Sequence, residues 1–248
     1  MEHIVRSRML SKLAISSFNI SFIVAVAIGS MAFTCAEPNS RALGALQGDA
    51  FNRPACKAAE MSNFMCFSPK MKAATQLQQS EGVRKAFEAT VDRAQKYLDS
   101  LKPSADKLVI FDLDDTLIDT VPYYAQPEPR DFRAWLHQRP VKYHASVLKL
   151  LKTAGERGFS IVYITGRRAE FTLPTAEQVQ ELHWDGAYTR PMGLGLTSEV
   201  YKKAVRQMLR GLGYTIVLNI GDQVTDHDLP IDESKGEFLL PNVMYTVY

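Results

Sequence analysis

The chain has 248 residues, a formal net charge of +2 at pH 7, 46% hydrophobic residues and 23% charged residues. This length accommodates one sizeable α/β domain with an N-terminal extension, and the composition is ordinary for a soluble globular protein. The small net charge, without a dense Lys/Arg cluster, argues against a protein that binds nucleic acid.

The first 36 residues have the composition of an export signal. A basic start is followed by residues 13–33, which carry no charge. We favour cleavage after Ala36 and a periplasmic or secreted protein. A retained membrane anchor is the alternative, because the apolar run is long for a cleaved signal. Cys35 offers a lipid attachment point, although the two residues before it fit a lipidation motif poorly. The basic residues are Arg6, Arg8 and Lys12.

Residues 37–70 contain three prolines and show no clear periodicity, so we expect irregular structure wrapped on the main domain. Cleavage of the signal would leave two cysteines, Cys56 and Cys66. An even pair in an exported chain favours one disulfide that closes a short loop, and two free buried thiols are the alternative. No ligand residues at suitable spacing accompany them, which argues against a metal site.

The third region, residues 71–248, has the pattern of an α/β domain. An apolar stripe predicts one helix over residues 72–101, and three apolar runs alternate with helical patterns. This alternation predicts a parallel sheet with helices on both faces. The predicted strands are 108–111, 159–165 and 214–220, with a last edge strand over 238–245. The predicted helices are 131–138, 141–157, 175–182 and 198–212.

The run Leu108–Phe111 ends abruptly in Asp112, Asp114 and Asp115. Three carboxylates at the end of a buried strand are costly unless something cationic offsets them, and a hard divalent cation is the natural candidate. The alternative is a polar turn in which Asp115 or Thr116 caps a helix.

Polar residues also end the other two strands, at Thr165 and at Asp222 and Asp226. Ligands of open parallel sheets bind at the carboxyl ends of the strands, so we expect these residues to meet. The oxygen ligands of Asp112 and Asp222 suit Mg²⁺.

This arrangement suits phosphoryl transfer. Asp112 can attack phosphorus, and Asp114 can protonate the leaving oxygen and later activate water. Thr165 and backbone amides near Gly166 can hold the phosphoryl oxygens. A lysine is still needed to offset the charge on those oxygens.

Two adjacent lysines compete for that role. Helical geometry places Lys202 at the edge of the apolar face of helix 198–212, whereas Lys203 points away from it. Lys202 is therefore the better candidate, and a solvated surface lysine is the alternative for both.

Four motifs resemble those of the haloacid dehalogenase (HAD) superfamily, in the same order: Asp112-Leu-Asp-Asp-Thr-Leu, Ile164-Thr-Gly-Arg, Tyr201-Lys-Lys and Gly221-Asp-Gln-Val-Thr-Asp. Fuller strings, including Leu240-Pro-Asn-Val-Met-Tyr, resemble its exported acid phosphatases, a branch with plant vegetative storage and bacterial class B and lipoprotein acid phosphatases. The resemblance covers about residues 70 to 248.

The resemblance implies a Rossmann-like fold and a Mg²⁺-dependent acid phosphatase that acts on small phosphomonoesters. It implies Asp112 as nucleophile, Asp114 as general acid/base, and Thr165 and Lys202 as phosphate holders. Mg²⁺ would bind Asp112, Asp222 and the backbone carbonyl of Asp114, with Asp226 in support directly or through water. Gly166 and Arg167, in the second motif, are candidate substrate-binding residues.

This chain departs from the family pattern at Val224, where relatives carry an aromatic residue, and at His227-Asp228, where they carry small or apolar residues. The departures leave substrate detail open. His227 can touch the metal site, but we expect an exposed loop histidine.

Only about residues 117–140 remain to cover the site, and we call this stretch the cap segment. We expect Tyr123 and Tyr124 within it to bind a leaving group with an aromatic face, such as a nucleoside or an aryl alcohol. The alternative is that these rings, with Trp135, pack the cap segment onto the domain. Two other functions stay open, a phosphotransferase and a non-catalytic storage or binding protein on the same fold.

Overall fold

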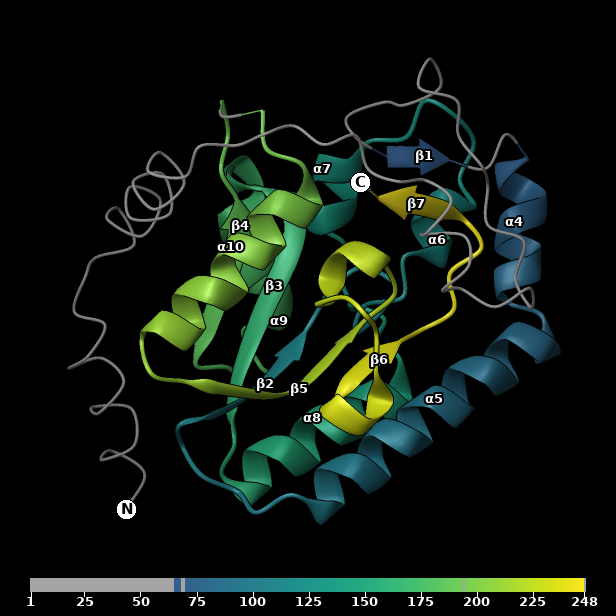
Figure 1. Ribbon diagram of the computed structural model, residues 1–248. Coiled ribbons are helices and arrows are strands. Elements are labelled where there is room, and N and C mark those ends of the chain that lie inside the picture. Colours follow the sequence, from purple (N-terminus) through teal and green to yellow (C-terminus); the bar gives the residue numbers. More distant parts are fainter. Residues whose placement is uncertain (1–64, 68–69, 194, 248) are drawn as a thin grey trace. The chain divides into compact units, whose positions relative to one another are not determined.

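The structure is a computed structural model that describes residues 65–67, 70–193 and 195–247 (Figure 1). All of them belong to one of the two units into which the chain divides, Asn39–Tyr248. The predicted signal, most of segment 37–70 and Cys56 lie outside these residues, so the disulfide stays a prediction. Among the described residues, no helix has the length and apolar character needed to span a membrane.

The core of the fold is a parallel sheet, as the sequence predicts. It has five strands in the order β4-β3-β2-β5-β6. The central strand is buried from Leu108 to Phe111, which explains its unbroken apolar run. Phe111 pairs with Tyr163 on one side and Ile220 on the other, so β2 and β5 end at about the same level beside β3. The strands are β2 (Lys107–Phe111), β3 (Ser160–Arg168), β4 (Gly186–Arg190), β5 (Thr215–Gly221) and β6 (Glu237–Leu239).

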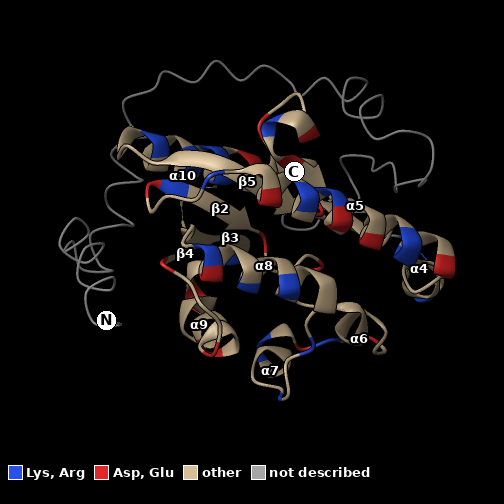
Figure 2. Cartoon of the chain, turned by 90° about the horizontal axis from the view of Figure 1, so that it is seen from below, with Lys and Arg blue, Asp and Glu red and all other residues tan. Residues whose placement is uncertain are grey.

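Helices cover both faces of this sheet, which confirms the predicted α/β class. Helix α10 packs on β3, β4 and β5 from one side, and α8 packs on β3 from the other, together with α9 (Figure 2). Helix α5 lies against α8 and also contacts β5 and β6. The bounds are α5 (Glu81–Ser100), α8 (Ala145–Arg157), α9 (Thr172–Val179) and α10 (Ser198–Gly211).

The single helix predicted over residues 72–101 is wrong, because the chain forms α4 (Met71–Gln78) and then α5. Ser80 separates them in an extended conformation, and its hydroxyl accepts a hydrogen bond from the Val83 amide. Serine is a preferred N-cap residue, so it begins a new helix rather than continuing the old one. The apolar stripe of the second helix is buried as expected, except that Tyr97 is partly exposed against Phe238.

The single edge strand predicted over residues 238–245 is also wrong. β6 is the edge of the main sheet, and β7 (Tyr245–Val247) forms a separate antiparallel pair with β1 (Met65–Phe67). Pro241 lacks an amide proton and cannot extend the ladder. Asn242 then turns the chain, since its side-chain oxygen accepts from the Met244 and Tyr245 amides.

The cap segment contains two short helices, α6 (Val121–Tyr124) and α7 (Phe132–Leu136). The second was predicted, whereas the first lies in a stretch expected to be loop. Pro122 is tolerated there because it sits in the first turn. Helix α8 starts four residues later than predicted, because Tyr143 pairs with Ile118 and keeps the preceding chain extended.

Gly236 is a position where the backbone requires glycine. Gly236, at the end of η4 (Glu233–Lys235), has φ +88°, and an added Cβ would lie 2.2 Å from the Val217 carbonyl oxygen. We expect Gly236→Ala to lower the free energy of unfolding by about 2–4 kcal/mol, from left-handed strain and overpacking. Urea unfolding measures it. Gly82→Ala is the matched control, with nothing near its Cβ, and is expected to raise stability by about 0.4–1 kcal/mol. Equal effects would contradict this reading.

Candidate active site

The acidic strand ends meet, as the sequence predicts. The Asp112 amide donates to the Ile220 carbonyl at 3.0 Å, which fixes the end of β2 against β5. Carboxylate oxygens of Asp112, Asp222 and Asp226 lie within 4.8 Å of one another, and all three residues are buried. Asp226 belongs to the 3-10 turn η3 (Val224–Asp226) that follows β5. Acidic residues 110 positions apart in sequence therefore form one cluster at the carboxyl ends of the strands.

Lys202 is the cation of this cluster. Its Nζ donates to Asp112 Oδ1 at 2.5 Å and also to Asp226 Oδ1. The side chain reaches the cluster from the first turns of α10 and is buried, whereas Lys203 is exposed. Burial lowers the pKa of Lys202, but Asp112 and Asp226 outweigh it and raise the pKa above its ordinary value. The lysine is therefore charged.

Burial acts in the opposite direction on the pKa of the carboxylates. Burial, reinforced by the neighbouring aspartates, raises the pKa of Asp112 well above its ordinary value, although Lys202 opposes this. Burial likewise raises the pKa of Asp222 to about 7. Asp222 accepts hydrogen bonds from Thr116, Gln223 and Asn242 at 2.6–3.2 Å. A nearby cation is what this cluster needs to stay ionised at neutral pH.

The donor set fits a hard divalent cation. All the ligand atoms offered are carboxylate oxygens, which Mg²⁺ prefers. Both oxygens of Asp226 already accept hydrogen bonds, one from Lys202 and one from the Gln223 amide. Asp226 therefore suits a supporting role. Among the described residues no hydrogen bond reaches Asp112 Oδ2, which leaves this oxygen free to react or to ligate.

Asp114 is held by Arg167 rather than left in the open. Arg167 donates Nε to Asp114 Oδ2 at 2.8 Å and Nη2 to Oδ1 at 2.6 Å. Its Nη1 donates to Thr175 and Gln178 of α9. The Arg167 side chain is only 1% exposed and that of Asp114 is 23% exposed. The sequence analysis proposed Arg167 as a substrate-binding residue, but here its guanidinium orients Asp114.

Thr165 and Gly166 lie at the end of β3 near α10. Thr165 is buried, and its hydroxyl accepts from the Arg167 amide at 3.3 Å. A Cβ on Gly166 would lie 3.0 Å from the Ser198 hydroxyl, so the backbone approaches α10 closely there. Gly166 thus lies close to α10 in the part of β3 where the pairing with β4 shifts register.

Asp115 has a role that neither sequence interpretation describes. It does not cap a helix, since none begins in the described residues after it before Val121. Instead it adopts φ 58° and accepts hydrogen bonds from the Thr120 amide, the Thr120 hydroxyl and the Tyr245 hydroxyl. Burial raises its pKa to about 7. Asp115 thereby ties the turn after β2 to the C-terminal strand.

Tyr123 and Tyr124 are both buried within an aromatic cluster. The Tyr124 ring lies 5.3 Å from that of Tyr245, and the Tyr123 ring lies 5.5 Å from that of Trp135. Arg130 covers both tyrosines. These contacts support the alternative in which the aromatic residues pack the cap segment onto the domain.

The expectation of an exposed His227 is wrong. The residue is 4% exposed, and its Nδ1 lies 2.8 Å from Glu237 Oε2 of β6. Arg206, which sequence reasoning missed, donates to the Asp226 and His227 carbonyls at 2.7 and 2.9 Å. It follows Lys202 by four residues on the same face of α10, and this spacing was the available signal. Together these residues fix the loop that carries Asp226.

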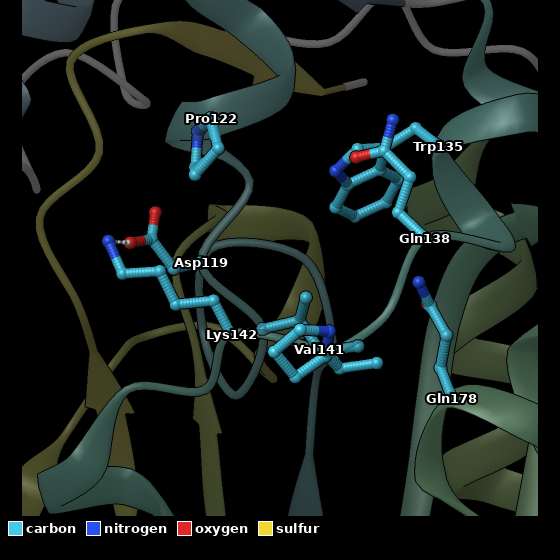
Figure 3. Close-up of a pocket in the computed structure, with 9 residues that line it drawn as sticks. Asp119, Pro122, Trp135, Gln138, Val141, Lys142 and Gln178 are labelled. Atoms are coloured by element: carbon cyan, nitrogen blue, oxygen red, sulfur yellow. Dashed lines mark ion pairs between the residues drawn. The ribbon is translucent and has the colours of Figure 1, made fainter.

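A cavity of about 170 Å³ lies outside the acidic cluster, between the cap segment and α9 (Figure 3). Asp119 and Lys142 form an ion pair at 2.6 Å on its wall. Trp135 and Gln178, which both contact Arg167, also line it. The remaining lining residues are Ile118, Pro122, Gln138, Pro140 and Val141.

Among solved structures, the chain resembles the class C acid phosphatase from Bacillus anthracis. The TM-score is 0.57 over 71% of this chain and 85% of that chain, at 17% sequence identity. This likeness concerns the fold. A second structure of the same protein, with tungstate bound, gives a TM-score of 0.55.

Similar sequences come from plants. Vegetative storage protein 1 of Arabidopsis thaliana is 34% identical over 160 residues, which are 60% of this chain and 58% of the relative. The match thus spans little more than half of that relative. Acid phosphatase 1 of Solanum lycopersicum is 28% identical over 179 residues, 67% of this chain and 70% of the relative.

The sequence model of the HAD superfamily, subfamily IIIB (Acid phosphatase), matches residues 44–248. The match begins well before residue 70, where the resemblance in the sequence analysis started. It covers most of the chain, and all four motifs lie within it. The chain therefore belongs to subfamily IIIB of the HAD superfamily, the acid phosphatase subfamily.

Proposed function

We propose that the protein is a Mg²⁺-dependent acid phosphatase that hydrolyses small phosphate monoesters through an aspartyl-phosphate. One observation carries this proposal. A buried aspartate at the end of the central strand, Asp112, has one oxygen paired with a lysine and the other without a donor in the described part of the chain. Membership of an acid phosphatase subfamily supports it.

In the first step Asp112 Oδ2 forms a bond to phosphorus, and the bond from phosphorus to the ester oxygen breaks. Asp114 gives its proton to that oxygen, so the alcohol leaves neutral. Lys202, already beside Asp112, offsets negative charge on the phosphoryl oxygens. Thr165 and the amides near Gly166 hold the same oxygens.

In the second step a water molecule attacks phosphorus of the aspartyl-phosphate. Asp114 takes its proton, the bond between Asp112 and phosphorus breaks, and inorganic phosphate leaves. Arg167 donates to both oxygens of Asp114 and thereby holds this carboxyl group in one orientation before the reaction.

Asp112 and Asp222 would hold Mg²⁺, together with the backbone carbonyl of Asp114, and Asp226 would support it. When bound, the ion supplies charge neutralisation that lets an anionic ester approach the carboxylates. We also propose that the protein acts outside the cytoplasm, as the basic and then uncharged N-terminal sequence indicates.

Two other functions stay open. A phosphotransferase would use the same residues with an alcohol in place of water, and product analysis with an added alcohol distinguishes it. The name of the Arabidopsis relative raises a non-catalytic storage role. The full set of acidic residues, with Lys202 in contact with Asp112, supports the enzyme.

The first prediction concerns the nucleophile. Asp112→Asn keeps the size of the side chain but cannot form the covalent bond, so we expect turnover of 4-nitrophenyl phosphate to fall by at least about a thousandfold. Thermal unfolding should show a folded protein. Asp92→Asn, an exposed aspartate of α5, is the matched control and should retain full activity. Near-normal activity in Asp112→Asn would exclude the covalent mechanism.

The second prediction concerns the metal. Chelation should abolish activity and Mg²⁺ should restore it. Because a ligand that binds only the folded state stabilises it, Mg²⁺ should also raise the Tm of the metal-free protein. Asp222→Asn should lose this rise. A chelated protein that still turns over, or rescue by zinc alone, would show that the oxygen-ligand argument is wrong.

The third prediction concerns the leaving group. We expect aryl phosphates and nucleoside monophosphates to exceed glycerol phosphate in kcat/KM. If the tyrosine rings contact the leaving group, Tyr123→Leu or Tyr124→Leu reduces that preference by about tenfold, the scale of one stacking contact. If the preference for aryl over glycerol phosphate is unchanged in both variants, the two rings only pack the cap segment onto the domain. Their burial favours this result.

A further inference from the structure

Arg167 is held from two sides, by α7 and by α9. On one side its guanidinium carbon lies 5.6 Å from the centre of the Trp135 ring and 5.8 Å from that of Phe132. These two rings of α7 stack on each other at 5.4 Å with an interplanar angle of 25°. On the other side Thr175 and Gln178 of α9 accept its Nη1 hydrogens at 3.1 and 2.7 Å.

The third side of the guanidinium faces Asp114. A planar guanidinium that donates to both oxygens of a carboxylate fixes the direction of the carboxylate as well as its distance. Asp114 is the more exposed partner, and no other hydrogen bond to its side chain is recorded among the described residues. Its orientation therefore depends on Arg167.

We propose that the cap helix α7 positions the general acid/base of the reaction through Arg167, with Trp135 as the principal positioning residue and Phe132 as its support. The proposal rests on the proposed function, because it takes Asp114 as the acid/base. Cation–π attraction strengthens when the pair is desolvated, and the Arg167 side chain is 1% exposed.

The cavity makes Trp135 the sensitive point of this arrangement. Trp135 and Gln178 contact Arg167 and also line the cavity (Figure 3). Replacing the indole by a smaller side chain adds its volume to an existing space, which is polar enough on the Asp119–Lys142 side to admit water. Arg167 then becomes hydrated and turns more freely, and Asp114 loses its fixed direction.

The consequence depends on the leaving group. Protonation by Asp114 matters greatly for an alkyl oxygen and little for 4-nitrophenolate, which leaves without a proton. We expect Trp135→Leu to reduce kcat/KM for alkyl phosphates by about 30-fold, within the range of general acid catalysis, and for 4-nitrophenyl phosphate by less than about threefold. A general loss of folded protein would lower both equally.

The experiment measures kcat/KM over a series of monoesters whose leaving groups span a wide range of pKa. Trp135→Leu and Arg167→Lys should both steepen the dependence on leaving-group pKa, since lysine cannot make the two-point contact. Trp135→Phe keeps a ring and should restore the wild-type slope. Trp184→Leu, the same change at a tryptophan that is 39% exposed, is the matched control. An unchanged slope in Trp135→Leu overturns the proposal.

A second measurement needs no turnover. In a nuclear magnetic resonance spectrum of the wild-type protein, the Nε–H of Arg167 should exchange slowly with water, because it is buried and bonded to Asp114. Exchange should be fast in Trp135→Leu and slow in Trp135→Phe. If the wild type hydrolyses no monoester yet shows this pattern, the proposed function fails and the positioning of Asp114 stands. Slow exchange in Trp135→Leu overturns the positioning itself.

Discussion

Repulsion between carboxylates is the constraint on which the site depends. The turn after β2 and the loop after β5 bring five aspartates together, four of them buried, where unpaired charge is costly. Two cationic side chains form ion pairs with these aspartates, Lys202 from α10 and Arg167 from the end of β3. Each reaches a different part of the cluster, so the two halves of the site have separate electrostatic partners. The aspartates are Asp112, Asp114, Asp115, Asp222 and Asp226.

Neutral side chains also donate hydrogen bonds to these carboxylates. Asn242 and Gln223 donate to Asp222, and Tyr245 donates to Asp115. Gln223 also accepts from the Val247 amide, which joins the acidic loop to β7. The contacts of Asn242, Tyr245 and Val247 use the chain after β6, which leaves the main sheet at Pro241. The departure from regular strand pairing thus serves the site, because it adds an amide and a phenol to the donors of two buried carboxylates.

Sequence periodicity was sufficient for the three central strands and for the choice of Lys202 over its neighbour, because these depend on local pattern. It was insufficient where a partner lies far along the chain. The burial of His227 depends on Glu237, and the role of Arg167 depends on Asp114, 53 residues earlier. The break between α4 and α5 was also missed. Apolar spacing alone predicts one continuous helix, but the Ser80 hydroxyl accepts a hydrogen bond from the Val83 amide and begins a new one.

The two-stranded sheet of β1 and β7 has a consequence for the order in which the protein becomes complete. Met65 pairs with Val247, and the residues that donate to Asp222 and Asp115 lie just before that pairing. During synthesis, every strand of the main sheet is therefore made before two of the donors to its acidic end, Asn242 and Tyr245. A nascent polypeptide that has reached only β6 carries the carboxylates without Asn242 and Tyr245. The donors that Asn242 and Tyr245 supply to the site thus follow β6 in the order of synthesis.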